Sequence, residues 1–192
     1  MVRLWRTPPR WLVLSLVLAV CPSVWAARPY VDGVSLNRGP RADLVVSFHV
    51  EQTLVPQLVE TLESGLPVRF TFWIRVDHPR PWARDYVLAD LRFERVLEKE
   101  NLEDRYRITF EDGRTVRTET DLSKAVRLMG RVEGVSLLPL AALAGPRPIF
   151  LRIKVRVQEF KLPFRLHRLL PFVSFWDVET DWYVLEIPRV LP

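Results

Sequence analysis

The chain has 192 residues, of which 48% are hydrophobic and 27% are charged, and its formal net charge is +5. This length suits a single domain with a sizeable core, and the composition is that of an ordinary globular protein. Only one cysteine is present. The composition therefore excludes a disordered chain and a small scaffold stapled by disulfides.

The first 27 residues predict export. Arg3, Arg6 and Arg10 precede an uncharged, largely apolar run over residues 11–27, which contains Val24-Trp25-Ala26. A basic start, a short apolar middle and a small-residue exit are the three parts of a secretory signal. We expect cleavage after Ala26, which leaves residues 27–192 as one exported domain.

Two alternatives to cleavage remain open. The leader is retained as a signal anchor, or Cys21 is lipid-modified. The apolar run is broken by Pro22 and is short for a membrane span, which needs about 20 apolar residues. Val20 precedes Cys21 and is larger than the small residue that normally precedes a lipid-modified cysteine. Membrane contact is thus expected only through an uncleaved leader or a peripheral surface.

Removal of residues 1–26 changes the charge balance. Three arginines and no acids are lost, so 28 basic residues become 25 against 23 acidic ones, and the net charge falls to +2. Nucleic-acid binding depends on the neutralisation of phosphates, so no nucleic-acid partner is expected. The mature chain would also hold no thiol, and its stability would rest on its core alone.

Alternation of apolar and polar residues dominates the mature chain and predicts half-buried strands. The inward-facing sets are Leu44, Val46, Phe48 and Val50; Val68, Phe70, Phe72, Ile74 and Val76; Val87, Ala89, Leu91 and Phe93; Tyr106, Ile108 and Phe110; and Ile149, Leu151, Ile153, Val155 and Val157. Asp112-Gly113 predicts a tight hairpin turn into a strand over 114–120. A last strand is expected over 175–187, and a short first strand over 31–36.

Two short helices are predicted between the strands. Leucines repeat every four residues from Leu54 to Leu62, with Thr53 as the expected N-cap and Gly65 after the end. A second helix is expected over 122–129, capped by Thr120 or Asp121 and stopped by Gly130. Because both are short and apolar on one side only, we expect them to cover a sheet edge or a barrel mouth.

About seven strands, few helices and no alternation of strands with helices predict a mainly β fold. The expected architecture is an antiparallel β-sandwich, immunoglobulin-like or C2-like, with two short capping helices. Half-buried strands with basic outer faces are typical of antiparallel sheets.

The sharpest group of acids is Asp177, Glu179 and Asp181, which alternate along one predicted strand. A straight strand spreads its carboxylates apart, whereas calcium needs six to eight oxygens at one point. We therefore expect cross-strand ion pairs with the basic row Arg152, Lys154 and Arg156 and no metal site.

The usual catalytic patterns are missing. His49, His78 and His167 lie in separate segments without zinc-ligand spacing, and His49 is expected on a solvated sheet face. Ser136 follows Gly134 but lacks the second glycine of a nucleophile elbow, and no glycine loop could cradle phosphates. We expect neither an enzyme nor a cofactor; a hydrolase built on Ser136 and His167 is only a remainder.

Two loops are candidates for partner binding. The first, residues 77–84, combines two prolines with His78, Arg80, Trp82 and Arg84. Tryptophan and arginine often carry interface energy, and a stiff loop loses little entropy on binding. The favoured alternative is that Trp82 folds back over an edge of the core.

The second loop, residues 162–172, alternates apolar with basic positions. Its candidate contact residues are Phe164, Arg165, His167 and Arg168. Such a segment suits an anionic membrane surface or a protein partner. The favoured alternative is a crossover that buries Leu166, Leu169 and Phe172.

A series of motifs in a fixed order resembles an exported proteobacterial domain of unknown function, the family numbered 4390. The residues are Ser64-Gly65-Leu66-Pro67-Val68, Trp82, Leu143, Gly145, Phe150, Leu162-Pro163, Leu166, Arg168, Trp176 and Trp182. The resemblance covers about residues 30–188. It departs at Phe150, where the family suggests a tyrosine and its hydrogen bond. It transfers no catalytic residue, and implies a periplasmic location and a gene neighbourhood with a sensor histidine kinase of the nitrogen-regulation type.

These observations favour a non-enzymatic periplasmic interaction module that binds a protein partner of the envelope, such as the outer portion of a membrane sensor. The alternative is a carrier or sensor of a small apolar ligand, held between the sheets beneath a lid formed by the helix at Leu54–Leu62.

Overall fold

The computed structural model describes residues 28–51, 53–159 and 176–188. Ten strands, two α-helices and one short 3-10 helix make up this described part. In chain order they are β1 (Tyr30–Arg38), β2 (Asp43–Glu51), α2 (Pro56–Glu63), β3 (Val68–His78), β4 (Tyr86–Glu100), β5 (Arg105–Thr109), β6 (Val116–Glu119), α3 (Leu122–Gly130), β7 (Val132–Pro139), η1 (Leu140–Leu143), β8 (Phe150–Glu159), β9 (Asp177–Glu179) and β10 (Tyr183–Glu186).

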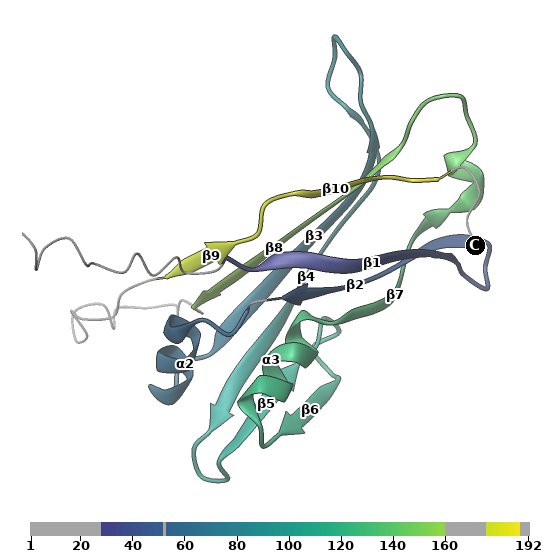
Figure 1. Ribbon diagram of the computed structural model, residues 1–192. Coiled ribbons are helices and arrows are strands. Elements are labelled where there is room, and N and C mark those ends of the chain that lie inside the picture. Colours follow the sequence, from purple (N-terminus) through teal and green to yellow (C-terminus); the bar gives the residue numbers. More distant parts are fainter. Residues whose placement is uncertain (1–27, 52, 160–175, 189–192) are drawn as a thin grey trace, which may run out of the picture.

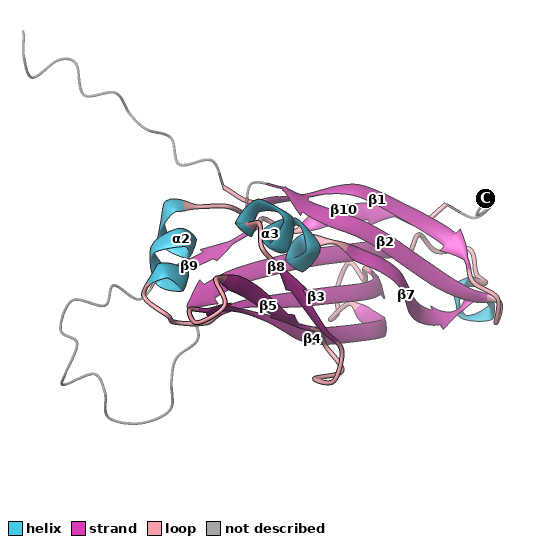
Figure 2. Ribbon diagram, turned by 90° about the horizontal axis from the view of Figure 1, so that it is seen from below, coloured by secondary structure: helices cyan, strands magenta, loops and turns pink. Residues whose placement is uncertain are grey.

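The strands form two antiparallel sheets. The smaller sheet has the order β1-β2-β7, and the larger, seven-stranded sheet has the order β10-β8-β3-β4-β5-β6, with β9 also paired to β8. The sheets lie one on the other (Figures 1 and 2), and β1 and β2 cross β3 and β4 in the view of Figure 1. The predicted antiparallel sandwich is confirmed, and the sheets stay open rather than closing into a barrel.

The core lies between the sheets and comes from the predicted alternation. The inward side chains of β2, β3 and β8 are buried; they are Leu44, Val46, Phe48, Val50, Val68, Phe70, Phe72, Ile74, Val76, Leu151, Ile153, Val155 and Val157. Every second residue of these strands faces the other sheet because successive side chains point to opposite sides.

Both helices close one end of the sandwich, opposite the connection between β3 and β4 (Figure 1). In α2, Leu58 and Leu62 are fully buried, and in α3 so are Ala125 and Met129. The helices are thus parts of the core. An alanine at Gly130 would place its Cβ 3.0 Å from the carbonyl oxygen of Val50, so glycine lets α3 approach β2 closely.

The helix boundaries depart from the prediction at one cap. Asp121 caps α3 as expected, since its carboxylate accepts a hydrogen bond from the Lys124 amide at 2.8 Å. Thr53 does not cap α2: the helix begins at Pro56, and the N-cap residue Val55 makes no side-chain bond. Proline fits the first helical position because its missing N–H would be unpaired there anyway.

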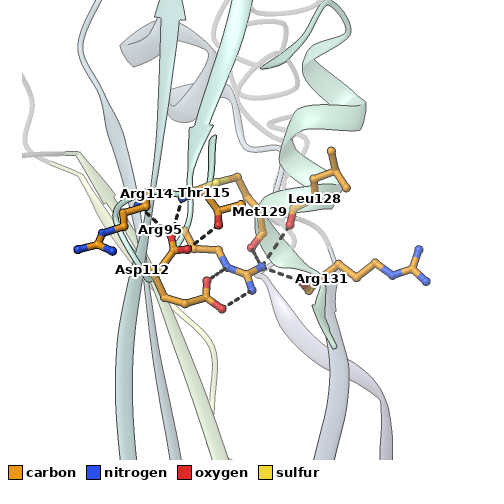
Figure 3. A network of polar contacts seen from close by, with 8 residues as sticks. Arg95, Asp112, Arg114, Thr115, Leu128, Met129 and Arg131 are labelled. Atoms are coloured by element: carbon orange, nitrogen blue, oxygen red, sulfur yellow. Dashed lines mark hydrogen bonds and ion pairs between the residues drawn. The ribbon is translucent and has the colours of Figure 1, made fainter. Parts of the chain in front are cut away.

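Arg95 was not predicted to lie in the core, yet its side chain is only 4% exposed. On β4 it continues the inward row of Leu91 and Phe93. Its guanidinium donates to the carbonyl oxygens of Met129 at 3.2 Å and Arg131 at 2.6 Å, where α3 ends (Figure 3). These carbonyls lack partners within the helix, and a cation there also favours the helix dipole.

A carboxylate and three aromatic rings complete the surroundings of Arg95. Glu111 accepts hydrogen bonds from its Nε at 2.9 Å and its Nη2 at 3.4 Å. The guanidinium carbon lies 4.9 Å from the ring centre of Phe110, 5.3 Å from that of Phe72 and 5.6 Å from that of Phe93. One buried cation therefore ties β4, the β5–β6 turn and α3 together.

The structure corrects the sequence analysis at three strands and one turn. The pairing of β3 with β4 shifts between Val76 and Asp77, so Val87 is 43% exposed while Leu88 packs against the core. The expected last strand is split in two at Thr180, which is buried. Its hydroxyl oxygen accepts a hydrogen bond from the Val155 amide at 3.0 Å. The hydroxyl therefore takes the place of a backbone carbonyl at the break.

The other two corrections concern β7 and the β5–β6 turn. β7 was not predicted, because Gly134, with φ of 65°, interrupts its alternation. The predicted turn at Asp112-Gly113 is present, but only Gly113 of this pair has a left-handed backbone conformation, with φ of 64°. Asp112 acts instead through its carboxylate, which accepts the Arg114 and Thr115 amides at 2.9 and 2.7 Å (Figure 3).

Candidate interaction surface

The connection between β3 and β4, residues 79–85, is the tip of a long hairpin that projects beyond the rest of the sandwich (Figure 1). We call these residues the tip. The two strands stay paired up to His78 and Tyr86. The tip is therefore carried by a regular ladder and lies at the end of the molecule away from both helices.

Trp82 is 98% exposed at the tip. The expectation that it folds back over an edge of the core is wrong, because the ladder carries the tip away from the apolar interior. Arg80 and Arg84 are exposed beside it. The tip thus presents a large aromatic side chain between two cations, and every residue from Pro79 to Val87 is exposed.

Ring contacts hold the base of the tip. The imidazole of His78 stacks on the Tyr86 ring with centroids 5.0 Å apart, and the guanidinium carbon of Arg80 lies 5.0 Å from the same ring centre. His78 Nδ1 is buried without a hydrogen-bond partner. Stacking therefore positions this ring, and Tyr86 lies between the sheet and the tip.

A buried ion pair fixes the strand ends below the tip. Asp77 is 1% exposed, and the Nε of Arg152 donates to its two carboxylate oxygens at 3.2 and 2.9 Å. The Nη2 of Arg152 lies 3.9 Å from Asp85. Asp77 below the tip and Asp85 at its last position therefore face the same arginine of β8.

A hollow of about 290 Å³ adjoins this base. His78, Tyr86 and Leu88 of the hairpin line one part of it, and the remaining lining comes from η1 and the loop before β8: Ala142, Ala144, Gly145, Pro146, Arg147 and Ile149. Arg147 is exposed. The hollow thus brings a third cation beside the hairpin that carries Arg80 and Arg84.

The second predicted contact loop cannot be placed. Phe164, Arg165, His167 and Arg168 lie outside the described residues, as do the alternative core residues of that loop. Their assignment stays a prediction.

Two of the three alternating acids pair as expected, whereas Asp181 lies between β9 and β10 and not on a common strand face with them. Arg156 forms ion pairs with Glu179 and, at 3.4 Å, with Asp177, and Lys154 also pairs with Glu179. Arg152 differs, because it holds Asp77. These carboxylates thus satisfy a basic sheet face. Within the described ranges, no three histidine, cysteine or acidic side chains are grouped closely enough to bind a metal ion.

The remaining polar candidates occupy sheet positions. The His49 side chain is 42% exposed, and its Nε2 lies 3.4 Å from Glu51 and 3.9 Å from Asp32. Ser136 lies within β7 rather than on a strand-to-helix turn. A hydrogen bond with Ser136 lowers the pKa of Asp43, so this hydroxyl stabilises a neighbouring carboxylate. His167 lies outside the described residues.

A larger groove, of about 630 Å³, lies between α3 and the smaller sheet. Its lining residues are Gly33, Ser47, Phe48, His49, Val50, Glu51, Glu119, Lys124, Arg127, Leu128, Arg131, Val132 and Glu133. Several core side chains thus meet charged residues at its edges, and its volume falls within the range of small-molecule sites. Sequence reasoning missed this groove because β7 was missed.

No helix in residues 28–51, 53–159 and 176–188 combines the length and apolar character needed to cross a membrane. Comparison with curated proteins found no match, and comparison with solved structures found none either. One family model matches residues 30–186, which is more than half of the chain; its description is domain of unknown function, DUF4390. The resemblance expected from the ordered motifs is therefore confirmed, and the chain belongs to the DUF4390 family.

Proposed function

We propose that this protein is a non-enzymatic interaction module of the cell envelope, exported by residues 1–26, and that it binds a protein partner through the hairpin tip. The outer portion of a membrane sensor is the partner class that we favour. The observation that carries the proposal is the complete exposure of Trp82 at the end of a projecting hairpin.

An exposed tryptophan is an unused source of binding free energy. An aromatic side chain buries about 200 Å², and at about 25 cal/mol per Å² its transfer from water is worth at most about 5 kcal/mol. In the free protein Trp82 gains almost none of this, because it is 98% exposed. A partner with an apolar pocket would recover part of it.

The tip is also pre-organised. Pro79 and Pro81 restrict its backbone, while the His78–Tyr86 stack and the Asp77–Arg152 pair fix the strand ends. A rigid contact element loses little conformational entropy on binding. Rigidity and an exposed aromatic side chain are properties of a contact element, and they support binding as the role of the tip.

The test is capture of partners from envelope extracts with wild type, Trp82→Ala and Arg84→Ala. We expect Trp82→Ala to lose the specific partner and Arg84→Ala to weaken its capture. Leu102→Ala is the matched control, because Leu102 is, among the residues that the structure describes, another fully exposed large apolar residue, and it lies in the turn that follows the opposite end of β4. Unchanged partners in both tip variants would remove the tip from the proposal.

Export has its own test. We propose that the mature protein begins at Ala27, so Edman sequencing of the protein from the envelope fraction would give Ala27-Arg28-Pro29. A protein that keeps its first residues would establish the signal anchor instead.

The groove beside α3 favours a second candidate, a carrier or sensor of a small apolar ligand. The structure gives less support to a lid formed by α2, because Leu58 and Leu62 are fully buried and hold this helix in the core. Native mass spectrometry of protein taken from cells would show a lipid-sized added mass in wild type that is lost in Leu128→Glu. Leu102→Glu is the control, since it adds the same charge far from the groove. A clean apo mass in wild type would end the carrier hypothesis.

A further inference from the structure

Charge is sorted at the hairpin end of the molecule. The three acids that the hairpin carries near the tip have cationic partners: Asp77 and Asp85 face Arg152, and Asp90 pairs with Arg75 at 2.7 Å. The cations Arg80, Arg84 and Arg147 form no ion pair within the described part of the chain. The fold therefore neutralises the carboxylates and leaves the cations facing outward.

This sorting comes from β8. Arg152 lies on the strand next to β3 and opposite Arg75, so it reaches Asp77 on the neighbouring strand and approaches Asp85 beyond it. Arg147 precedes the same strand and lines the hollow at the hairpin base. Arg152 of β8 thus neutralises carboxylates at the hairpin, and Arg147, in the loop before β8, adds a positive charge beside it.

We propose that the tip recognises an acidic surface of its protein partner, with Trp82 entering an apolar site bordered by carboxylates. This inference rests on the proposed function and names the chemistry of the partner. Complementary charges at the rim of an interface speed association and exclude like-charged partners, while the buried aromatic side chain holds the complex. An acidic partner fits because cations around Trp82 that lost their water against an uncharged surface would be left without counter-charges, and a basic surface would repel them.

The experiment places a photo-crosslinker at the tip by Trp82→p-benzoylphenylalanine, which keeps an aromatic side chain there. After irradiation with native envelope extract, mass spectrometry identifies the cross-linked peptide. We expect a protein peptide with an excess of Asp and Glu. The same crosslinker at Leu102 is the control and should not label it.

Charge reversal then separates the inference from the proposed function. In the crosslinker background, Arg84→Glu with Arg147→Glu should lower the yield about tenfold, which corresponds to about 1.4 kcal/mol shared by two rim contacts. Arg84→Lys with Arg147→Lys should keep most of the yield, and salt should lower the yield of the crosslinker variant that retains Arg84 and Arg147. Arg41→Glu with Arg114→Glu is the matched control, because it makes the same charge change at exposed sites elsewhere and should have no effect.

Four outcomes would overturn the inference. A partner peptide that is not acidic, or a yield that does not change on reversal at Arg84 and Arg147, refutes the acidic surface but leaves binding through Trp82 intact. Cross-links to phospholipid alone would replace the protein partner with a membrane surface. No cross-link at all, together with unchanged partner capture by Trp82→Ala, would refute the proposed function as well.

Discussion

The two ends of β4 differ in what surrounds them. Toward its C-terminal end, Arg95 and Leu97 are buried under α3 and the β5–β6 hairpin. Toward its N-terminal end, Tyr86 and Val87 are exposed and lead into the tip. One strand therefore connects a region of dense packing with a region that has almost none, and the molecule places its free aromatic side chain where substitutions cost the fold least.

The contrast extends to the arginines. Arg95 is buried and fully bonded to carbonyls and a carboxylate, whereas Arg84 is exposed and has no ion-pair partner within the described residues. Removing a buried donor leaves the buried carbonyls that it bonds without a partner, while an exposed charge contributes little to stability. The comparison predicts that stability depends on the first arginine and binding on the second.

The largest expected effect comes from Arg95→Met. This change keeps much of the apolar stem but leaves Glu111 and the carbonyls at the end of α3 without their donor. We expect the free energy of unfolding to fall by about 2–4 kcal/mol, measured by urea denaturation. A loss below about 1 kcal/mol would show that the buried network is not what anchors this end of β4.

A smaller and pH-dependent effect is expected from Glu111→Gln. Burial acts to raise the pKa of Glu111, but hydrogen bonds from Arg95 and its own backbone outweigh it, and the pKa lies below its ordinary value of 4.5. A carboxylate with a lowered folded-state pKa adds stability above its unfolded pKa, and that stability is lost as pH falls through the folded value.

The unfolding free energy of wild type should therefore decline below about pH 4.5 more steeply than that of Glu111→Gln, which has no proton to gain at this position. Urea denaturation at a series of pH values measures both slopes. Parallel curves for the two proteins would contradict the role of Glu111 as the titrating partner of Arg95.

The smallest effect on stability is expected from Trp82→Ala. Because the side chain is 98% exposed, its loss should change the free energy of unfolding by no more than about 0.5 kcal/mol. The control Leu102→Ala should behave alike. A clear destabilisation by Trp82→Ala alone would mean that the tip packs on the fold, and it would erase the distinction between the two ends.

Much of this architecture follows from periodicity. The alternation in β2, β3 and β8 predicted both the strands and the buried side of each, and the ion pairs of Glu179 followed from its spacing. Arg95 was missed because a charged residue ended the inward row at Phe93, although Leu97 resumes it two positions later. That resumption is the signal that could have located it.

Features that depend on irregular pairing could not be predicted in the same way. The bulge that exposes Val87, the break at Thr180 and the interruption of β7 at Gly134 each shift the two-residue period by one position. A strict pattern then fails even though the strand persists. At the tip, residue types suggested a contact role, but the exposure of Trp82 depends on how far the paired hairpin extends.

The isolation of Trp82 also gives the protein an optical probe. Trp176 donates its indole N–H to Thr61 at 2.7 Å, and Trp73 lies near the guanidinium groups of Arg92 and Arg156, whereas Trp82 is surrounded by solvent. Its emission should be the most red-shifted of the four tryptophans in the described residues, because the fourth, Trp182, is only 46% exposed. Iodide, drawn by Arg80 and Arg84, should quench it more strongly than caesium, so loss of iodide quenching would report directly on occupancy of the tip.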